Sequence, residues 1–346
     1  MSDYLAVTHM AGPYVTAYPW SGSGFGVKFS DPSVDVAGTG RGVSFSTSGD
    51  AIAVSHTSSP YVTAYPWSGS GFGTKFSDPA TLPADFGYSV GFTAADDAVA
   101  VGHIDSPYVT AYPWSGSGFG VKFSDPATLP TGTCRSVGFT TAGDAIAVGH
   151  ASSPYVTAYP WSGSGFGTKF SDPATLPASL GNGVDFTAAD DAVAVAHSTT
   201  PYITAYPWSG SGFGVKFSDP ATLPAGNDNS ISFTAADDAV VAAHAVSPYV
   251  IAYPWSGSGF GVKFSDPATL PTGHGVGVDF TAADDAVAVA HAVSPYVIAY
   301  PWSGSGFGTK FSDPATLPAS TGQKLSFGSD AAAIPRTQNY YRLLRL

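Results

Sequence analysis

The sequence predicts an all-β fold, a seven-bladed β-propeller with four antiparallel strands per blade. Pro-Tyr recurs seven times, always 47 residues apart, from Pro13 to Pro295. The seven Trp of the chain follow in step, from Trp20 to Trp302. A fixed period of this length indicates a repeat architecture. Within each period, alternating apolar and small or polar residues lie between clusters of Gly, Pro, Ser and Asp, as in short strands joined by turns.

The unit at 276–318 shows the elements in order. The first strand alternates apolar with small or polar residues, and the second places Val on one face and Ala on the other. The third gathers Tyr and Trp on one face, and the fourth ends at Asp313-Pro314. No segment shows a helical period over ten residues. The four strands are expected at 276–280, 286–291, 296–302 and 307–312.

The two ends of the chain predict how the ring closes. Each blade carries large side chains on one face and small ones on the other. Both faces can be buried only between two neighbouring blades, so the ring must close. Residues 3–9 are in phase with the second strand of a unit, and residues 325–327 with the first. We therefore expect one blade built from both ends and a single propeller over 1–329. The repeat decays after Ser329, and the tail at 330–346 has no predicted place.

The unit resembles the WD40-like propeller repeat. Phe280-Thr281-Ala282-Ala283-Asp284-Asp285 stands where that family has Phe-Ser-Pro-Asp-Gly, and Trp302-Ser303 stands where it has Trp-Asp. The resemblance covers residues 3 to about 329. The family's Gly-His dipeptide is missing, so its His–Asp–Ser network is not carried over. The resemblance implies an interaction scaffold.

Composition excludes several classes of protein. The net charge is −12, all acidic residues are Asp, and seven of the 13 Lys and Arg are one Lys per repeat. A basic surface for nucleic acid is therefore not expected. The N-terminus carries no signal-like stretch and no apolar run is long enough to span a bilayer. We predict a monomer without membrane contact, either cytoplasmic or virion-associated. A lone cysteine, Cys134, allows no disulfide within the chain.

The differences between units cluster in two connections. These are the link from the fourth strand to the next first strand, and the turn between the second and third strands. Both emerge on the same face of the ring. Loops on a rigid scaffold often carry binding residues, although loops also tolerate drift. The predicted partner-binding residues are Arg41, Asp85, Phe86, Tyr88, Arg135, Leu180, Asn182, Asn227, Asp228, Asn229, His274, Gln323 and Lys324.

The repeated polar residues favour structural roles. One His per blade, at the end of the second strand, is too far from its copies to share an ion, so no metal and no cofactor is expected. A hydrogen bond to the Asp of Ser-Asp-Pro is expected instead. The paired Asp of each turn point apart and bond their own backbone, which makes them poor acid and base partners. Catalysis by Cys134 is not expected either.

These observations predict a non-enzymatic scaffold that grips one unknown protein or glycan through the variable face. One alternative is a lectin-like binder with equivalent sites in each blade, using residues such as Tyr253, Trp255 and Phe260. Core packing is the favoured interpretation of that aromatic stripe. A second alternative is a structural component of a virion or surface assembly. An enzyme is disfavoured because a single active site needs unlike residues from different blades, which only the variable loops could supply.

Overall fold

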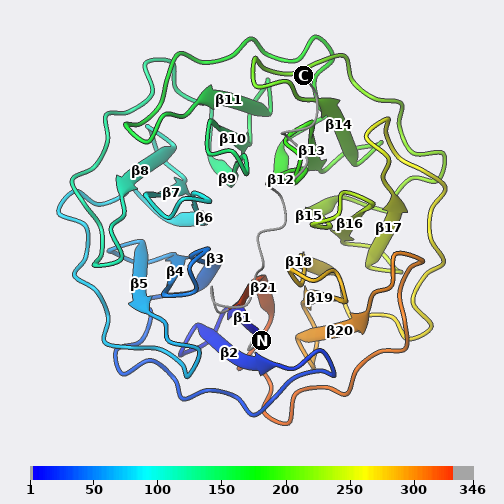
Figure 1. Ribbon diagram of the computed structural model, residues 1–346, viewed down its shortest axis with the longest axis horizontal. Helices are drawn as coiled ribbons and strands as arrows, with labels where there is room; N and C mark the ends of the chain where they lie inside the picture. The colour runs from blue at the N-terminus through cyan, green and yellow to red at the C-terminus, as the bar shows by residue number, and fades with distance from the viewer. Residues whose placement is uncertain (1–2, 330–346) are drawn as a thin grey trace, which may run out of the picture.

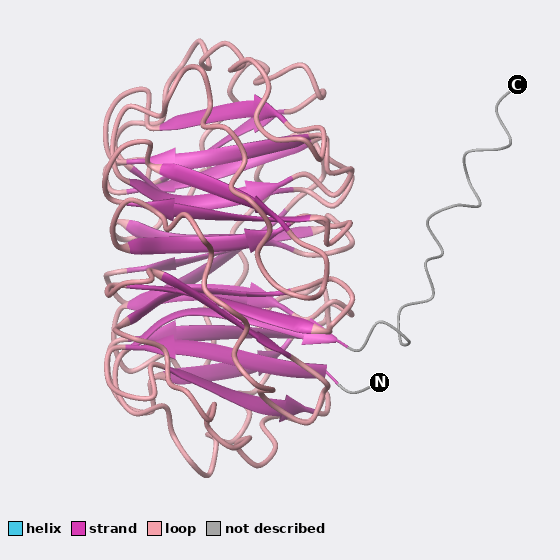
Figure 2. Ribbon diagram, turned by 90° about the vertical axis from the view of Figure 1, so that its left-hand side faces the viewer, coloured by secondary structure: helices cyan, strands magenta, loops and turns pink. Residues whose placement is uncertain are grey.

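The computed structural model describes residues 3–329 as seven three-stranded antiparallel sheets set around a central axis (Figure 1). Seen from the side, the sheets form a flat disc with loops on both faces and around the rim (Figure 2). The described residues contain strands, turns and loops and no helix. The predicted seven-bladed β-propeller is confirmed.

Each blade has an inner, a middle and an outer strand, counted from the axis (Figure 1). The inner strands are β3 (Gly40–Phe45), β6 (Gly87–Phe92), β9 (Cys134–Phe139), β12 (Gly181–Phe186), β15 (Asp228–Phe233), β18 (Gly275–Phe280) and β21 (Gly322–Ser329). The middle strands are β1 (Asp3–His9), β4 (Ala51–His56), β7 (Ala98–His103), β10 (Ala145–His150), β13 (Ala192–His197), β16 (Ala239–His244) and β19 (Ala286–His291). The outer strands are β2 (Val15–Trp20), β5 (Val62–Pro66), β8 (Val109–Pro113), β11 (Val156–Pro160), β14 (Ile203–Pro207), β17 (Val250–Pro254) and β20 (Val297–Pro301).

One sheet joins strands from distant parts of the sequence. In the sheet β2-β1-β21, β1 pairs antiparallel with β2 on one side and with β21 on the other. The register places Asp3 opposite Ser329 and Leu5 opposite Phe327. The backbone hydrogen bonds of this blade therefore tie residues near both ends of the described chain together.

The expected fourth strand is only partly formed. Beyond each outer strand the chain makes one isolated bridge, for example between Trp67 and Phe72. Two further bonds follow, because Gly73 N donates to Pro66 O at 2.8 Å and Phe76 N donates to Ala64 O at 3.0 Å. The Gly-rich sequence prevents regular pairing here, since Gly weakens a strand and marks bends. The outer edge is thus covered by an irregular segment.

The core lies between blades, where the large face of one meets the small face of the next. Tyr253 and Trp255 pack with Ala192 and Ala194 of the preceding blade. Phe217 meets Trp255 edge to face, with the ring centroids 5.4 Å apart. Tyr253 is 1% exposed and Trp255 4% exposed. The aromatic stripe is therefore core, and it offers no ring face on which a sugar could stack.

The paired Asp of each turn between inner and middle strands perform two different tasks. Asp191 stays within its own turn, but it accepts a bond from the side-chain hydroxyl of Thr187, Oγ1, at 2.8 Å and not the expected bond from its own backbone. Asp190 instead reaches the preceding blade, where it accepts bonds from Thr141 N and Ala142 N, each at 2.7 Å. The expectation that both Asp bond only their own turn was wrong, because the neighbouring turn presents two free N–H groups.

Candidate functional site at one mouth of the ring

The second residue of every inner strand points to a common cavity on the axis. These seven residues line about 180 Å³ together with Lys324, and we call them the mouth ring. They stand at the beginning of the inner strands, on the side of the variable connections. Each of them occupies the same position of the repeat. Because the blades surround one axis, the seven side chains from this variable position meet in one cavity. The mouth ring consists of Arg41, Tyr88, Arg135, Asn182, Asn229, Val276 and Gln323.

A β-bulge in each blade places the mouth ring. In β3, Gly40 pairs with His56 and Gly42 with Ser55, so that Arg41 between them has no partner across the sheet. The same shift occurs at this position in the other six blades. A bulge bends the strand and redirects the extra side chain. Gly40 is required beside it, since a Cβ there would lie 2.3 Å from Tyr14 O.

One side of the mouth is cationic and aromatic. The guanidinium carbon of Arg41 lies 5.6 Å from the ring centroid of Tyr88, and that of Arg135 lies 5.7 Å from it. Arg41 also donates from Nη1 to Gln323 Oε1 at 2.8 Å. A tyrosine ring between two guanidinium groups holds both by cation–π attraction. The arrangement concentrates positive charge and planar N–H donors at one place.

The other side is lined by amides fixed to the backbone. Asn182 Nδ2 donates to Asp228 O at 2.8 Å and to Ser198 Oγ at 3.0 Å. Asn229 Nδ2 donates to Gly275 O at 2.8 Å. Each amide is thus anchored to the next inner strand. Anchored amides in a cavity supply fixed hydrogen-bonding groups without the entropy cost of ordering them on binding.

Lys324 reaches the mouth ring from its own inner strand. At this repeat position the other blades carry only Gly or Ser, and a Cβ at Gly277 would lie 2.9 Å from the Cα of Lys324. Its Nζ donates to Asn229 O at 2.6 Å. Burial lowers the pKa of Lys324 to about 7. Because burial disfavours the charged form, part of this amine is neutral near pH 7.

Within residues 3–329, every Lys or Arg side chain without a carboxylate partner lies at the mouth of the ring. Residues 3–329 contain ten Lys and Arg. Seven of them are the repeated Lys, each paired with the Asp three residues later. The other three are Arg41, Arg135 and Lys324, all at this cavity. In a chain with a net charge of −12, this convergence favours an anionic or strongly polar ligand.

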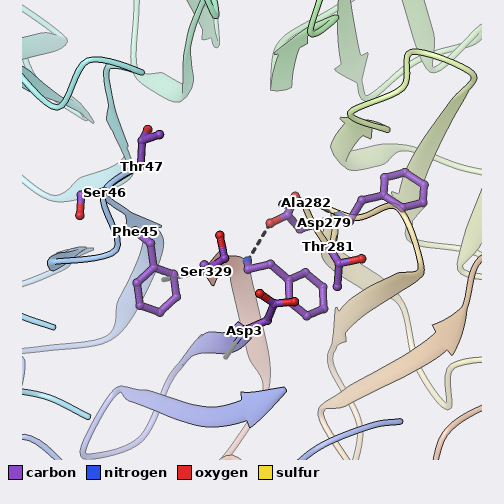
Figure 3. Close-up of a pocket in the computed structure, with 11 residues that line it drawn as sticks. Asp3, Phe45, Ser46, Thr47, Asp279, Thr281, Ala282 and Ser329 are labelled. Atoms are coloured by element: carbon purple, nitrogen blue, oxygen red, sulfur yellow. Dashed lines mark hydrogen bonds between the residues drawn. The ribbon is translucent and has the colours of Figure 1, made fainter. Parts of the chain in front are cut away.

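A second cavity, of about 280 Å³, lies at the opposite end of the inner strands (Figure 3). Asp279 points into it, but its carboxylate accepts bonds from Phe327 N at 2.9 Å and Phe280 N at 3.0 Å. Burial raises the pKa of Asp279 to about 6 and the pKa of Asp185 to about 7. Asp185 likewise accepts a bond from Phe233 N at 2.9 Å. These two Asp satisfy the exposed N–H groups of neighbouring inner strands, so the mouth ring is the better candidate for chemistry.

The structure places the thirteen sequence-predicted site residues in three different environments. Seven of them line the mouth: Arg41, Tyr88, Arg135, Asn182, Asn229, Gln323 and Lys324. Asp85, Phe86, Leu180, Asn227 and His274 lie in the connections and do not line it. Asp228 is a correction, because it is 0% exposed and no partner can reach its side chain. It occupies a position where five blades carry Gly.

The sequence reasoning missed Val276, Asp185 and Asp279. Val276 belongs to the mouth ring, although its apolar side chain gives no sign of a binding role in the sequence. The missed signal is positional: 41, 88, 135, 182, 229, 276 and 323 are 47 apart, and their residue types vary. Asp185 and Asp279 stand three residues further along, where the other blades carry Ser or Gly.

The repeated His are structural, but with a different partner from the one predicted. In five blades His Nε2 lies 2.9 Å from a Thr Oγ1 on the outer strand, as His56 does from Thr63. The expected Asp partner is wrong, since the outer strand lies closer. Among residues 3–329, no group of three or more His, Cys, Asp or Glu could hold a metal ion. The same part of the chain has no helix that could cross a membrane.

No protein-family model and no curated protein matches the chain. Solved structures match it in fold. The periplasmic gluconolactonase of Pseudomonas aeruginosa has a TM-score of 0.71 at 12% identity, covering 95% of this chain and 99% of that one. A candidate 6-phosphogluconolactonase from Bacteroides fragilis has a TM-score of 0.75 at 11% identity, covering 95% and 98%. A protein from Lactobacillus plantarum has a TM-score of 0.70 at 13% identity, covering 95% and 100%.

These matches correct the functional prediction. The names of these lactonase propellers contradict the prediction of a non-enzymatic scaffold and its lectin-like and structural alternatives. Unlike residues from different blades meet at the bulged position of the inner strands as well as in the loops, so near-identical blades do not exclude an active site. The WD40-like resemblance is limited to the architecture of a seven-bladed β-propeller.

Proposed function

We propose that this protein hydrolyses a small sugar lactone at the mouth ring. The observation that carries the proposal is the convergence of Arg41, Arg135 and Lys324, the three described cations without a carboxylate partner, on one cavity lined by anchored amides. The names of the similar propellers support the reaction class. The cavity of about 180 Å³ is small, and its convergent polar groups suit a small polar ligand.

The residues can be given roles in ester hydrolysis. The neutral amine of Lys324 accepts a proton from water, whose oxygen bonds to the lactone carbonyl carbon. Arg41 and Arg135 donate hydrogen bonds to the carbonyl oxygen as it becomes negative. The ring C–O bond then breaks, and the proton passes from Lys324 to the leaving alkoxide. The product is an open-chain hydroxy acid, with its hydroxyl groups facing the amides of the mouth.

The test is hydrolysis of glucono-δ-lactone and its 6-phosphate, followed by acid release at constant pH. Homoserine lactone, which lacks the sugar hydroxyls, serves as the comparison substrate. We expect the sugar lactones to be hydrolysed above their spontaneous rate. The double variant Arg41→Ala/Arg135→Ala should lower kcat/KM by roughly 100-fold or more, because both donors to the oxyanion are lost.

His274→Ala is the matched control. His274 is exposed in a variable connection on the same face and does not line the cavity. It should leave kcat/KM unchanged. No sugar lactone hydrolysed above background by the unaltered protein, or equal loss in the control and the double variant, would overturn the proposal.

A further inference from the structure

The blades are joined by a repeated carboxylate contact on the face opposite the mouth ring. In four junctions, an Asp in the turn after the inner strand accepts bonds from two consecutive backbone N–H groups of the preceding blade's turn. The eight distances lie between 2.6 and 2.8 Å. The four Asp have positive φ of 54° or 55°, which aims the side chain across the junction. They are Asp96, Asp190, Asp237 and Asp284.

One junction inside the described chain lacks its carboxylate. The turn at Ala94 and Ala95 is the same turn, but the residue that would bond it is Gly143. Gly143 has a φ of 69°, close to that of the four Asp, and a Cβ there would meet nothing within 4 Å. The N–H pair of Ala94 and Ala95 has no acceptor among residues 3–329. The backbone of both turns thus has nearly the same conformation as at the other four junctions, but no side-chain carboxylate joins them.

The four occupied junctions show what this place accepts. A carboxylate spans both N–H groups, with one oxygen on each. The charged form of this carboxylate is disfavoured on balance. Burial and nearby Asp side chains raise the pKa of Asp190, whereas the two N–H bonds lower it. At the empty junction the corresponding neighbours are Asp97 and Asp190. An external carboxylate would meet the same donors and the same neighbouring charges.

We propose that the junction between the turns of Ala94 and Gly143 is a binding site for a carboxylate supplied from outside the chain. Two adjacent N–H groups of a turn form an anion-binding concavity, and four copies of this turn within the same protein bind a carboxylate in it. The site is independent of the lactone reaction and lies at the other end of the inner strands. Its ligand is a small organic acid or an acidic side chain.

The test is amide NMR of the full chain during titration with sodium acetate at constant ionic strength, with sodium chloride as reference. We expect saturable shifts at the amides of Ala94 and Ala95, with half-saturation on the order of 10 mM. The occupied turn at Thr141 and Ala142 should not respond. A parallel titration with blocked aspartate, N-acetyl-aspartate N-methylamide, distinguishes a side-chain carboxylate from a small acid.

Two variants complete the design. Gly143→Asp supplies the missing carboxylate and should abolish the response at Ala94 and Ala95. Gly143→Asn, which tolerates positive φ but is uncharged, shows whether filling the space alone is enough, and we expect it to weaken the response less. Asp190→Gly should move a new response to Thr141 and Ala142. Shifts at Ala94 and Ala95 no larger than those at the occupied turns, or shifts that survive Gly143→Asp, would overturn the proposal.

Discussion

At the scale of single residues, the site depends on one bulged position per repeat. The bulge removes Arg41 and its six counterparts from the pairing of the sheet, so their identity is free of the constraints that keep the rest of each blade constant. Replacing such a residue changes the lining of the cavity, although Asn182 and Asn229 also bond the next inner strand. The residue before the bulge, in contrast, has little space for a side chain, because a Cβ at Gly40 would collide with Tyr14 O.

Asp228 stands at the position equivalent to Gly40, and its replacement by Gly tests how much a buried carboxylate there destabilises the protein. Its two carboxylate oxygens are buried without a hydrogen-bond partner among the described residues, and burial raises its pKa well above the usual value. Asp228→Gly restores the residue of most other blades and should stabilise the protein by about 1–3 kcal/mol at pH 7. Urea unfolding measures the change.

The pH dependence of that gain has a definite sign. A carboxyl whose pKa is raised on folding stabilises the fold only while it is protonated, and this contribution falls as pH rises above about 4. Asp228→Gly should therefore gain more at pH 8 than at pH 5. The exposed Asp105, replaced by the Ser of two other blades, is the control and should change the free energy of unfolding little. A gain that shrinks with rising pH would contradict the account.

Lys324 gives a second prediction at this scale. As a base with a pKa of about 7, it should make kcat/KM for the sugar lactone rise through pH 7 and level off above it. Lys324→Met should remove this rise and lower the plateau. Lys324→Arg keeps the charge but not the base, so it should retain KM better than kcat. A pH profile that is unchanged in Lys324→Met would exclude Lys324 as the base.

At the scale of elements, the turns between inner and middle strands hold neighbouring blades together. Asp237→Ala removes the bonds from Ala188 N and Ala189 N. It also leaves an alanine, whose side chain cannot form hydrogen bonds, at a φ of 55°. We expect a loss of about 1–3 kcal/mol in the free energy of unfolding. Asp219→Ala breaks the ion pair with Lys216 within one blade and should cost less than about 1 kcal/mol. Equal losses would show that the contact across the junction contributes nothing special.

The strands themselves could be predicted because alternation and turn residues are local properties of the sequence. The three regular strands of each blade appear where the pattern places them, as at β18–β20. The fourth is irregular because Gly residues such as Gly304 and Gly306, both with positive φ, bend the chain away from regular pairing. Periodicity alone does not report such backbone conformations.

The site was only partly predictable for a different reason. Variation between repeats pointed to Arg41 and Tyr88, but it also pointed to loop residues such as His274 that do not line the cavity. What separates the two groups is the bulge, which comes from the pairing of two strands and has no signature in one strand alone. The cross-blade role of Asp190 was missed likewise, because its partners lie 48 and 49 residues away.

At the scale of the whole molecule, the seven repeated His set the response to acid. All are buried, and burial lowers the pKa of each to about 4. A His with a lowered pKa stabilises the fold at high pH, and this contribution is lost as pH falls from about 6.5 toward 4. Six Asp whose pKa is raised act in the opposite direction, but backbone N–H bonds moderate the shift in all of them except Asp228. They are Asp185, Asp190, Asp228, Asp237, Asp279 and Asp284.

We therefore expect the free energy of unfolding to fall between pH 7 and pH 4.5, by an amount on the order of several kcal/mol. Urea unfolding at pH 7, 5.5 and 4.5 measures it. Asp228→Gly should steepen the fall, because it removes one of the groups that oppose it. A midpoint that stays constant or rises toward pH 4.5 would mean that the His are charged, or solvated, in the folded protein.

The ring as a whole depends on the blade that joins β1, β2 and β21. Leu325 packs with Leu5, Val7 and Trp20, and the pairing of β1 with β21 completes the sheet. A chain that ends at Thr321 leaves the edge of β1 unpaired and uncovers this cluster. Because each blade buries its faces only against neighbours, we expect that chain to lose cooperative unfolding and to aggregate.

Adding the missing strand as a separate peptide distinguishes loss of closure from general damage. The peptide Gly322–Ser329 should restore a cooperative transition whose midpoint rises with peptide concentration, since binding to the folded state stabilises it by mass action. The same peptide with Leu325→Asp should not, because it would place a charge in the cluster with Leu5 and Trp20. A shortened chain that unfolds as cooperatively as the full one, without peptide, would show that six complete blades and an open seventh are enough to hold the ring.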